Sequence, residues 1–393
     1  MTDPIAIRDL TTLRVGGVPL AMVAPQTEAE LVAAALEVWA HDDNWMLLGG
    51  GSNTLASDEE FDGTVIRLVT RGIEVLGAGA AAEAGDTAGD GSGGAADRIR
   101  LRVQAGEPWD DLVAYTVAQG WAGLEALSGI PGAAGAAPVQ NIGAYGQEIA
   151  ASLTAVDFLD CDAHEVRRLT AEELQLGYRT SALKQGLRGI VLAIELDLHD
   201  TTAEASVLGS ALSQPVAYEQ LAGSLGVQLG DRVPIQALRD TVLALRRSKG
   251  MVLDAADPDT ASAGSFFTNP IVTESFARTL PESAPRWAQE SVIPDRVIPI
   301  EEYYGVGPIP GVEEVRMVKL SAAWLIENAG IKRGFRLPGS RAAISSKHTL
   351  ALTNTGSATS DEIAQLARFV QGRVASEFGV ILQPEPVLIG VEL

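Results

Sequence analysis

Three consecutive glycines follow a short apolar run near the start of the chain. In the segment Leu48-Gly49-Gly50-Gly51-Ser52-Asn53, several unobstructed backbone N–H groups stand in sequence beside two small polar side chains. Such an array can bind phosphate oxygens, although a tight turn after a strand explains the same glycines. The segment contains no Gly-x-Gly-x-x-Gly motif, which argues against a Rossmann site. A dinucleotide, if one binds, would bind on another fold.

A second glycine-rich stretch is longer and also contains prolines and amide side chains. It comprises Leu127-Ser128-Gly129-Ile130-Pro131-Gly132 and, after a short gap, Pro138-Val139-Gln140-Asn141-Ile142-Gly143-Ala144-Tyr145-Gly146. This composition favours extended backbone lying against a flat ligand. A loop rich in turn residues is the alternative.

The elements around these segments alternate irregularly between strands and helices. Thr27 and Glu30 form a capping-box pattern before apolar residues at helical spacing, which predicts a helix over residues 28–40. Pro108 predicts the start of a second helix that ends near Gly120. Strands are predicted at Trp45–Leu48, Val65–Val69, Ile99–Val103, Thr154–Leu159 and Gly189–Leu198. Because regular βαβα alternation is lacking, we expect an α+β fold.

Strand patterning is lost after Asp200 and returns in the last part of the chain. Amphipathic helices are predicted at Val318–Asn328 and Asp361–Phe378, with strands at Leu350–Thr353 and Val387–Val391. These elements predict a second α+β unit, with a boundary between residues 215 and 250. Residues 77–97 are almost entirely Gly, Ala, Asp and Glu, which predicts a low-complexity, mobile loop without function.

The charge and the single cysteine of the chain limit its partners and its location. The 393 residues carry 29 Lys and Arg against 51 Asp and Glu, a formal charge of −22. This charge argues against binding to nucleic acid or to an anionic membrane surface, so an anionic ligand needs locally placed donors. Cys161 is the single cysteine, and no signal-like segment is present, so we expect a reducing, cytoplasmic location. No apolar run is long enough for membrane insertion, and no His/Cys/Asp spacing indicates a metal site.

The two glycine-rich segments together resemble the FAD-binding elements of the UDP-N-acetylenolpyruvoylglucosamine reductase family. Further motifs similar to those of the family follow in family order: Leu176-Gly177-Tyr178-Arg179, Gly264-Ser265-Phe266-Phe267-Thr268-Asn269-Pro270, Lys319–Gly330 with Ala323-Trp324-Leu325-Ile326, and Gln383-Pro384-Glu385-Pro386. The resemblance covers the chain from about Thr11 to Leu393. It implies a vanillyl-alcohol-oxidase-type (PCMH-type) FAD-binding region of two subdomains, residues 1–70 and 71–215, followed by an α+β substrate-binding domain, residues 216–393.

The resemblance implies NADPH-dependent reduction of UDP-N-acetyl-3-O-(1-carboxyvinyl)-glucosamine to UDP-N-acetylmuramate, in peptidoglycan precursor synthesis. FAD would accept hydride from NADPH and pass it to the enolpyruvyl methylene carbon. Neither glycine-rich segment contains a His or Cys for covalent attachment, so the FAD is expected to be non-covalent. The implied partners are the nucleotide sugar and NADPH, and no obligate protein partner is evident. The residues implied to bind FAD are Gly49, Gly50, Gly51, Ser52, Asn53, Ser128, Gly129, Ile130, Pro131, Gly132, Gln140, Asn141, Gly143, Ala144, Tyr145 and Gly146.

Three residues match the catalytic positions of the family. The carbon next to the hydride acceptor becomes carbanionic, and its charge spreads into the substrate carboxylate. Arg179 is implied to hold that carboxylate, with a surface ion pair as the alternative. Glu385, protonated or sharing a proton, is implied to assist the same charge. Ser265 is implied to protonate the carbanion, prealigned by Glu385 or water, with capping of the Gly264 turn as the alternative.

Five further residues are interpreted as substrate contacts. Tyr218 resembles the mobile-loop tyrosine of the family's first subtype, which closes over uridine diphosphate. Lys249 lies in a basic patch that could bind a diphosphate, or it ends a solvated helix. Asn269 would present its amide to diphosphate or sugar unless it only forms a turn, and Tyr178 contacts substrate or nicotinamide unless it lies in the core. His348 is interpreted as polar structure beside the substrate rather than as a base.

Two segments, residues 77–97 and 272–311, depart from the family pattern, and neither contains a motif residue. Two alternative functions are open: another FAD-dependent oxidoreductase of the same fold, using oxygen and an alcohol or sugar, and a non-catalytic nucleotide-sugar-binding protein. The lack of an attachment residue for covalent flavin argues against the first. The joint presence of Arg179, Ser265 and Glu385 argues against the second, because binding alone requires no proton donor.

Overall fold

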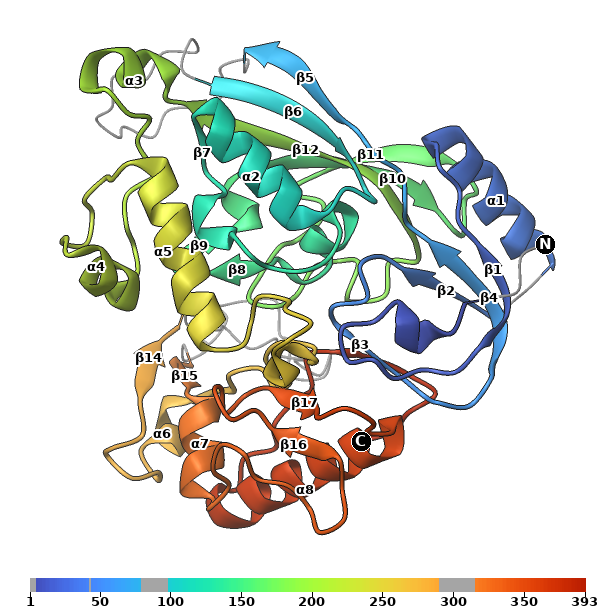
Figure 1. Cartoon of the computed structure of the whole chain (residues 1–393), viewed down its shortest axis with the longest axis vertical. Coiled ribbons are helices and arrows are strands. Elements are labelled where there is room, and N and C mark those ends of the chain that lie inside the picture. Colours follow the sequence, from blue (N-terminus) through green and yellow to red (C-terminus); the bar gives the residue numbers. More distant parts are fainter. Residues whose placement is uncertain (1–4, 42–43, 79–97, 290–314) are drawn as a thin grey trace, which may run out of the picture.

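The computed structural model describes residues 5–41, 44–78, 98–289 and 315–393. Within these ranges, a large antiparallel sheet, a small parallel sheet and a C-terminal unit of helices and short strands lie around a common centre (Figure 1). The mixture of elements, without regular βαβα alternation, agrees with the predicted α+β class.

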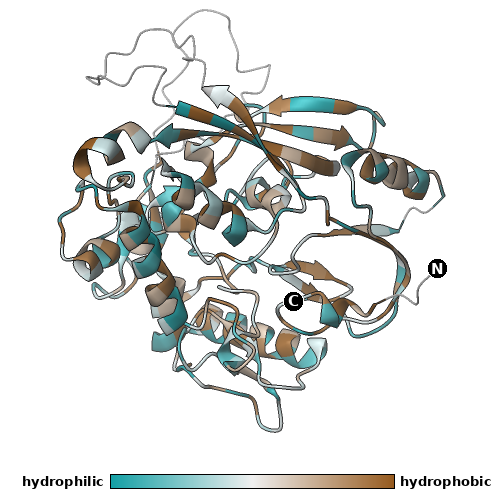
Figure 2. Cartoon of the chain, turned by 45° about the horizontal axis from the view of Figure 1, so that its top comes forward, coloured by the Kyte–Doolittle hydropathy of each residue, from teal (hydrophilic) through white to brown (hydrophobic). Residues whose placement is uncertain are grey.

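The large sheet has the strand order β11-β10-β12-β6-β5, and β7 pairs with the end of β12. In β6, Leu101 and Val103 are fully buried, whereas the alternate residues are arginines. On the face of the sheet that carries these arginines, Arg102 Nη2 lies 2.7 Å from Asp157 Oδ2. Hydrophobic and hydrophilic residues alternate along strands of this sheet in Figure 2. The strands are β5 (Ile73–Ala78), β6 (Arg98–Gln104), β7 (Trp121–Ala122), β10 (Leu153–Asp160), β11 (Val166–Thr170) and β12 (Gly189–Asp200), which confirms the three strands predicted in this part.

The small parallel sheet delivers the first glycine-rich segment to the centre of the molecule. Its order is β1 (Pro19–Val23), β4 (Phe61–Arg67) and β2 (Trp45–Leu48). Helix α1 (Glu28–His41) buries Leu31 and Ala35 in the same hydrophobic cluster as Ile66 of β4. The predicted helix and the strand ending at Leu48 are confirmed, and the strand predicted at Val65–Val69 begins earlier, at Phe61.

One helix lies between β6 and β7 of the large sheet, and three follow β12 and lead to the C-terminal unit. They are α2 (Trp109–Gln119), α3 (Thr202–Leu208), α4 (Glu219–Leu225) and α5 (Ile235–Ser248). Helix α5 buries Leu238 and Val242 in a cluster with Ala126. Arg239 of α5 also makes two hydrogen bonds, of 2.7 and 3.0 Å, to the carboxylate of Asp110 in α2. The first half of α5 is therefore fixed against α2.

The C-terminal unit is built around helix α8 (Ser360–Phe378), as the sequence predicted. A capping box of Thr359 and Glu362 starts this helix, and Ile363, Leu366 and Val370 bury its apolar stripe. The other elements are β13 (Ile271–Thr273), α6 (Glu274–Ala277), β14 (Arg286–Ala288), β15 (Met317–Leu320), α7 (Ala322–Asn328), β16 (Ala342–Ile344) and β17 (Leu352–Asn354).

The end of the chain returns to its beginning. Strand β18 (Val387–Ile389) pairs in parallel with β3 (Thr54–Ala56), and Val387 N–H donates to Asn53 O at 2.9 Å. The segment just before β18, which contains Glu385, is consequently held beside the first glycine-rich segment.

The prediction of a helix at Val318–Asn328 is wrong for the first turn. Met317–Leu320 instead forms β15 between β13 and β14, and α7 begins at Ala322. Ser321 Oγ accepts a hydrogen bond from Trp324 N–H at 3.2 Å and so caps the helix. The short apolar run before Ser321 fits a strand and a helix equally well, and the two neighbouring strands decide between them.

The two segments that depart from the family pattern, residues 77–97 and 272–311, lie only partly within the described residues. Gly77 and Ala78, expected in the loop at residues 77–97, belong to β5, and residues 79–97 lie outside the described residues. The beginning of the segment at residues 272–311 contributes to β13, α6 and β14, and residues 290–311 lie outside the described residues. In the described ranges, no helix combines the length and the apolar character needed to cross a membrane.

Asn354 ties the C-terminal unit to the amino-terminal segment, and its loss should destabilise the protein. The residue is 5% exposed, and its Nδ2 donates to Leu13 O while its Oδ1 accepts from Gly356 and Ala358 N–H groups. Asn354→Ala leaves these buried groups unpaired, so we expect the free energy of unfolding to fall by about 2–4 kcal/mol in urea denaturation followed by tryptophan fluorescence. The exposed Asn328→Ala should change it by less than about 0.5 kcal/mol. An equal loss in both variants would contradict this role.

Candidate active site

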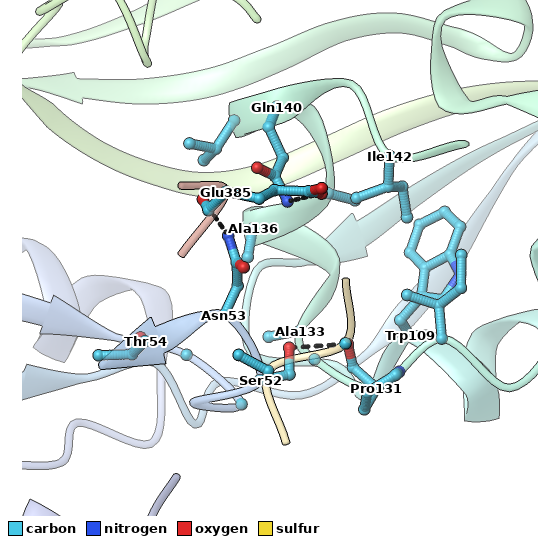
Figure 3. A pocket seen from close by; sticks show the side chains of 18 of the residues that line it. Ser52, Asn53, Thr54, Trp109, Pro131, Ala133, Ala136, Gln140, Ile142 and Glu385 are labelled. Atoms are coloured by element: carbon cyan, nitrogen blue, oxygen red, sulfur yellow. Dashed lines mark hydrogen bonds between the residues drawn. The ribbon is translucent and has the colours of Figure 1, made fainter. Parts of the chain in front are cut away.

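A cavity of about 610 Å³ lies where the three groups of elements meet. Small-molecule and cofactor sites occupy roughly 300–1,000 Å³, so the cavity can hold a sizeable ligand. Arg179, Ser265 and Glu385, which are far apart in the sequence, all line it. Figure 3 shows Asn53 and Gln140 reaching Glu385 from two different segments. The predicted FAD-binding residues on the wall are Gly49, Gly50, Gly51, Ser52, Asn53, Ile130, Pro131, Gly132, Gln140, Gly143, Ala144 and Tyr145.

The two glycine-rich segments lie backbone against backbone at the cavity wall. A Cβ atom on Gly50 would lie 2.6 Å from Gly132 Cα, and one on Gly51, whose φ is +61°, would lie 2.0 Å from Leu10 O. Ser52 Oγ donates a hydrogen bond of 2.8 Å to Pro131 O (Figure 3). Space therefore requires glycine at position 50, and the two segments form one continuous wall.

The first glycine-rich segment presents unpaired backbone donors. Within the described ranges, the N–H groups of residues 49–52 have no protein acceptor. Consecutive N–H groups without internal partners form a nest that favours anionic oxygens. This arrangement favours the phosphate-site interpretation of the segment over a plain turn.

Arg246, in the last turn of α5, adds a buried cation to the wall. It is 6% exposed, and its Nη2 donates to Met251 O at 3.1 Å, whereas its Nε has no hydrogen-bond partner. Burial lowers the pKa of Arg246, while Tyr145 and Asp110 act in the opposite direction, and a guanidinium keeps its charge in such surroundings. An anionic ligand would offset the cost of burying this charge.

Arg179 and Glu385 form an ion pair beside the cavity. Arg179 Nε lies 3.1 Å from Glu385 Oε1, and Gln140 Nε2 donates to the same oxygen at 3.2 Å. Arg179 Nη2 donates to Gly143 O at 3.0 Å, and the residue has a φ of +54°, which is uncommon outside glycine. The structure thus brings together the two side chains that were expected to act on one carboxylate.

The carboxyl group of Glu385 is held closer to its neutral form than an exposed glutamate. Burial raises the pKa of Glu385, and the opposing effects of Arg179 and Lys184 are smaller. The ion pair with Arg179 stabilises the charged form, but the loss of hydration outweighs it. The group can therefore take up and release a proton at a higher pH than an ordinary glutamate.

Ser265 has a different neighbour from the one expected. Its Oγ lies 3.3 Å from His348 Nε2, and both residues line the cavity, whereas Glu385 or water is the expected neighbour. Burial lowers the pKa of His348 to about 4, and the nearby Lys249, Arg246 and Arg333 act in the same direction. The imidazole is consequently neutral at physiological pH.

Tyr218 and Lys249 both lie against Tyr145 at the cavity. The rings of Tyr145 and Tyr218 are 5.7 Å apart in an edge-to-face arrangement, and Lys249 Nζ lies 5.5 Å from the centroid of Tyr145. Lys249 Nζ also donates to Gln220 Oε1 at 3.0 Å. Tyr218 precedes α4 and is 43% exposed, so it covers this part of the cavity without being buried.

Some predicted site residues support the wall without lining it. Asn141 Nδ2 donates to Glu148 Oε2 at 2.8 Å, and Asn269 Oδ1 accepts from Ala322 N–H at 2.9 Å at the start of α7. The Tyr178 ring lies 4.8 Å from Lys319 Nζ. The predicted residues away from the wall are Ser128, Gly129, Asn141, Gly146, Tyr178 and Asn269.

Two wall cations were not predicted as site residues. Arg246 was noticed only as part of a basic patch, and its position in the last turn of an amphipathic helix is the signal that could have selected it. Lys184 has no comparable signal, because only the fold brings it near Glu385. Among the described residues, no group of three or more His, Cys, Asp or Glu side chains could hold a metal ion.

Two family models match the chain. Residues 19–168 match the model described as an FAD binding domain, and residues 257–389 match the one described as the C-terminal domain of UDP-N-acetylenolpyruvoylglucosamine reductase. An FAD-binding domain followed by this C-terminal domain, with one cavity between them, defines the class as an FAD-dependent oxidoreductase. The predicted fold class is confirmed.

Relatives extend the match to the whole chain. A UDP-N-acetylenolpyruvoylglucosamine reductase of Leifsonia xyli is 59% identical and covers 100% of both chains, and one of Saccharopolyspora erythraea is 45% identical and covers 100% of this chain and 96% of its own. The crystal structure of the reductase from Thermus caldophilus has a TM-score of 0.57 at 25% identity, covering 98% of this chain and 97% of that chain. This protein belongs to the UDP-N-acetylenolpyruvoylglucosamine reductase family.

Gly50→Ala should weaken FAD binding, because the new Cβ would force the two glycine-rich segments apart. We expect the dissociation constant for FAD, measured by fluorescence titration of the apoprotein, to rise at least about tenfold. Gly372→Ala is the matched control: it lies in α8 with no atom within 4 Å of an added Cβ. That variant should bind FAD normally, and normal binding by Gly50→Ala as well would contradict the assignment of this wall.

Proposed function

We propose that this protein reduces UDP-N-acetyl-3-O-(1-carboxyvinyl)-glucosamine to UDP-N-acetylmuramate with NADPH, through FAD, in peptidoglycan precursor synthesis. The observation that carries the proposal is the pairing of Arg179 with Glu385 on a wall shared with Ser265 and both glycine-rich segments. This arrangement combines a cation for the substrate carboxylate with a hydroxyl proton donor. A protein that only binds a nucleotide sugar needs no such donor.

The wall fits a flavin dinucleotide. The free N–H groups of residues 49–52 and the guanidinium of Arg246 are suited to the diphosphate. The second glycine-rich segment is not extended as expected, because residues 138–140 belong to a 3-10 helix, but it lines the same wall and would lie against the flat ring. When bound, FAD supplies the hydride transfer that connects NADPH to the sugar substrate.

The side chains of this protein would handle the charge and the proton of the reaction. Arg179, oriented by its hydrogen bond to Gly143 O, holds the substrate carboxylate. Glu385 shares a proton with that carboxylate, because its own pKa is raised by burial. Ser265 gives its hydroxyl proton to the carbanionic carbon. Each role is given to a side chain that already lines the cavity.

Tyr218 and Lys249 would bind the nucleotide end of the substrate. In this proposal Lys249 provides a cation for the diphosphate and Tyr218 closes over it, as in the mobile-loop tyrosine subtype. The exposed position of Tyr218 before a short helix supports this role. Tyr178 and Asn269 would support the substrate side from behind the wall, and His348 would be polar structure beside the substrate.

The proposal includes the organisation of the chain. It comprises FAD-binding subdomains at residues 1–70 and 71–215 and a substrate-binding domain at residues 216–393, with α5 as the junction because it packs on α2. A cytoplasmic location is compatible with the single cysteine, which is free and buried.

Anaerobic stopped-flow absorbance tests the proposed function. NADPH should bleach the bound flavin, and the enolpyruvyl nucleotide sugar should restore its oxidised spectrum without oxygen. Bleaching without substrate-dependent recovery would point to another FAD oxidoreductase. Failure to bind flavin would favour the binding-protein alternative.

Ser265→Ala should separate the two half-reactions. Flavin reduction by NADPH should persist, whereas reoxidation by the substrate should slow by about 10²–10⁴-fold, because the carbanion loses its proton donor. The exposed Ser248→Ala is the control and should leave both rates unchanged. An unchanged second half-reaction in Ser265→Ala would exclude Ser265 as the donor.

Lys184→Met should shift the pH dependence of flavin reoxidation. Lys184 and Arg179 lower the pKa of Glu385 against the larger effect of burial, so removing Lys184 should raise that pKa further. Glu385 would then stay protonated to a higher pH, and the decline of the rate with rising pH should move upward. Lys332→Met, an exposed site, serves as the control. An unshifted profile in Lys184→Met would contradict a role for the protonated carboxyl.

A further inference from the structure

Ser265 and His348 form a pair whose usual interpretation does not fit this site. Ser265 Oγ and His348 Nε2 are 3.3 Å apart, a spacing typical of a serine activated by a histidine base. A base must accept the hydroxyl proton and become an imidazolium. Here burial of the ring lowers its pKa, Lys249, Arg246 and Arg333 lower it further, and Glu327 acts in the opposite direction. The site therefore disfavours the imidazolium, and the ring stays neutral.

The turn that carries His348 is firmly held. Ser346 donates to the carboxylate of Asp259 through its backbone N–H at 2.8 Å and its Oγ at 2.6 Å. Lys347 Nζ lies 2.5 Å from Asp257 Oδ2. Both aspartates belong to the segment that leads into the Ser265 loop, so the imidazole and the hydroxyl are positioned by the same anchor.

The backbone fixes the pair from the other side. Phe266 N–H donates to Leu350 O at 2.7 Å. This hydrogen bond joins the residue after Ser265 to the residue two positions after His348. His348 N–H itself donates to Ser345 Oγ at 3.2 Å. This contact is preorganised, as expected for a group that must point a proton in one direction.

We propose that His348 is a positioning residue for Ser265: its neutral imidazole donates Nε2–H to Ser265 Oγ and thereby turns the hydroxyl hydrogen toward the cavity. The inference rests on the proposed reductase function. With the Oγ lone pair occupied by the imidazole, the hydroxyl hydrogen is free for the substrate. The opposite tautomer would accept that hydrogen and point it away from the cavity.

The proton transfer balances without any change in the imidazole. The Ser265 O–H bond breaks, its electron pair stays on Oγ, and the proton forms the new C–H bond at the carbanionic carbon of the substrate. The imidazole N–H stabilises the resulting alkoxide through a charge-assisted hydrogen bond. Water then returns a proton to Oγ and leaves as hydroxide, so His348 gains and loses no proton.

Two substitutions test this role in the flavin-loaded enzyme. His348→Leu removes the donor, whereas His348→Gln can place an amide N–H where the imidazole Nε2–H was. In anaerobic stopped-flow, flavin reoxidation at saturating substrate should slow about 100-fold in His348→Leu and less than about tenfold in His348→Gln. The solvent deuterium isotope effect should grow in His348→Leu, because proton donation becomes the slow step. Substrate affinity, measured by the change in the flavin spectrum, should stay within about threefold of the wild type.

The tautomer gives a readout that does not depend on activity. Nitrogen NMR of protein with labelled histidine should show His348 neutral, with its proton on Nε2. A proton on Nδ1 would overturn the proposal, as would wild-type reoxidation in His348→Leu. Weakened substrate binding with an unchanged maximal rate would assign His348 to substrate binding instead and would also overturn it. If the wild-type enzyme itself fails to reoxidise with the enolpyruvyl substrate, the proposed function fails, and the NMR result still tests the hydrogen bond on its own.

Discussion

The segment at residues 383–387 holds the centre of the site together, because it bonds to the first glycine-rich segment, to the loop that contains Ser265 and to Arg179. Val387 N–H and Glu385 O both meet Asn53 beside the first glycine-rich segment. Glu385 N–H donates to Phe266 O, next to Ser265, and the Glu385 carboxylate meets Arg179. A few extended residues thus set the separation of the flavin wall, the carboxylate-binding pair and the proton donor. Prolines on both sides of Glu385 restrict this segment to extended conformations, which suits such a connector.

The net negative charge of the chain is a second constraint on the site. A chain with a formal charge of −22 repels anions at long range, so anion binding depends on a few cations placed at the cavity itself. Arg179 and Lys184 lie near Glu385, and Arg246 and Lys249 lie near His348. The two pairs give the cavity one place for a carboxylate and another for phosphates. This separation suits an elongated ligand with both kinds of group.

The sequence predicted those features that depend on local pattern. The strand before Gly49 and the helix at residues 361–378 follow from apolar periodicity and capping residues, and both are present. Features that depend on partners distant in sequence could not be predicted in this way. The apolar run before Ser321 becomes a strand because β13 and β14 flank it, and Asn269 binds the start of α7 rather than pointing into the cavity. The contact between Ser265 and His348 spans 83 residues, and nothing in either local sequence indicates it.

The neutrality of His348 must survive ligand binding if the ring is to position a proton donor. Lys249 and Arg246 lower the pKa of His348, but they are also the cations best placed to bind phosphate, and a bound phosphate would offset part of their effect. Desolvation is the largest cause of the lowered pKa, and a ligand that fills the cavity would remove more water from the ring. A bound anion therefore weakens only the effect of the neighbouring charges on the pKa of His348, which is the smaller effect. The effect of burial remains, and it grows as the site closes. Burial, rather than the neighbouring charges, is what keeps His348 a donor throughout the reaction.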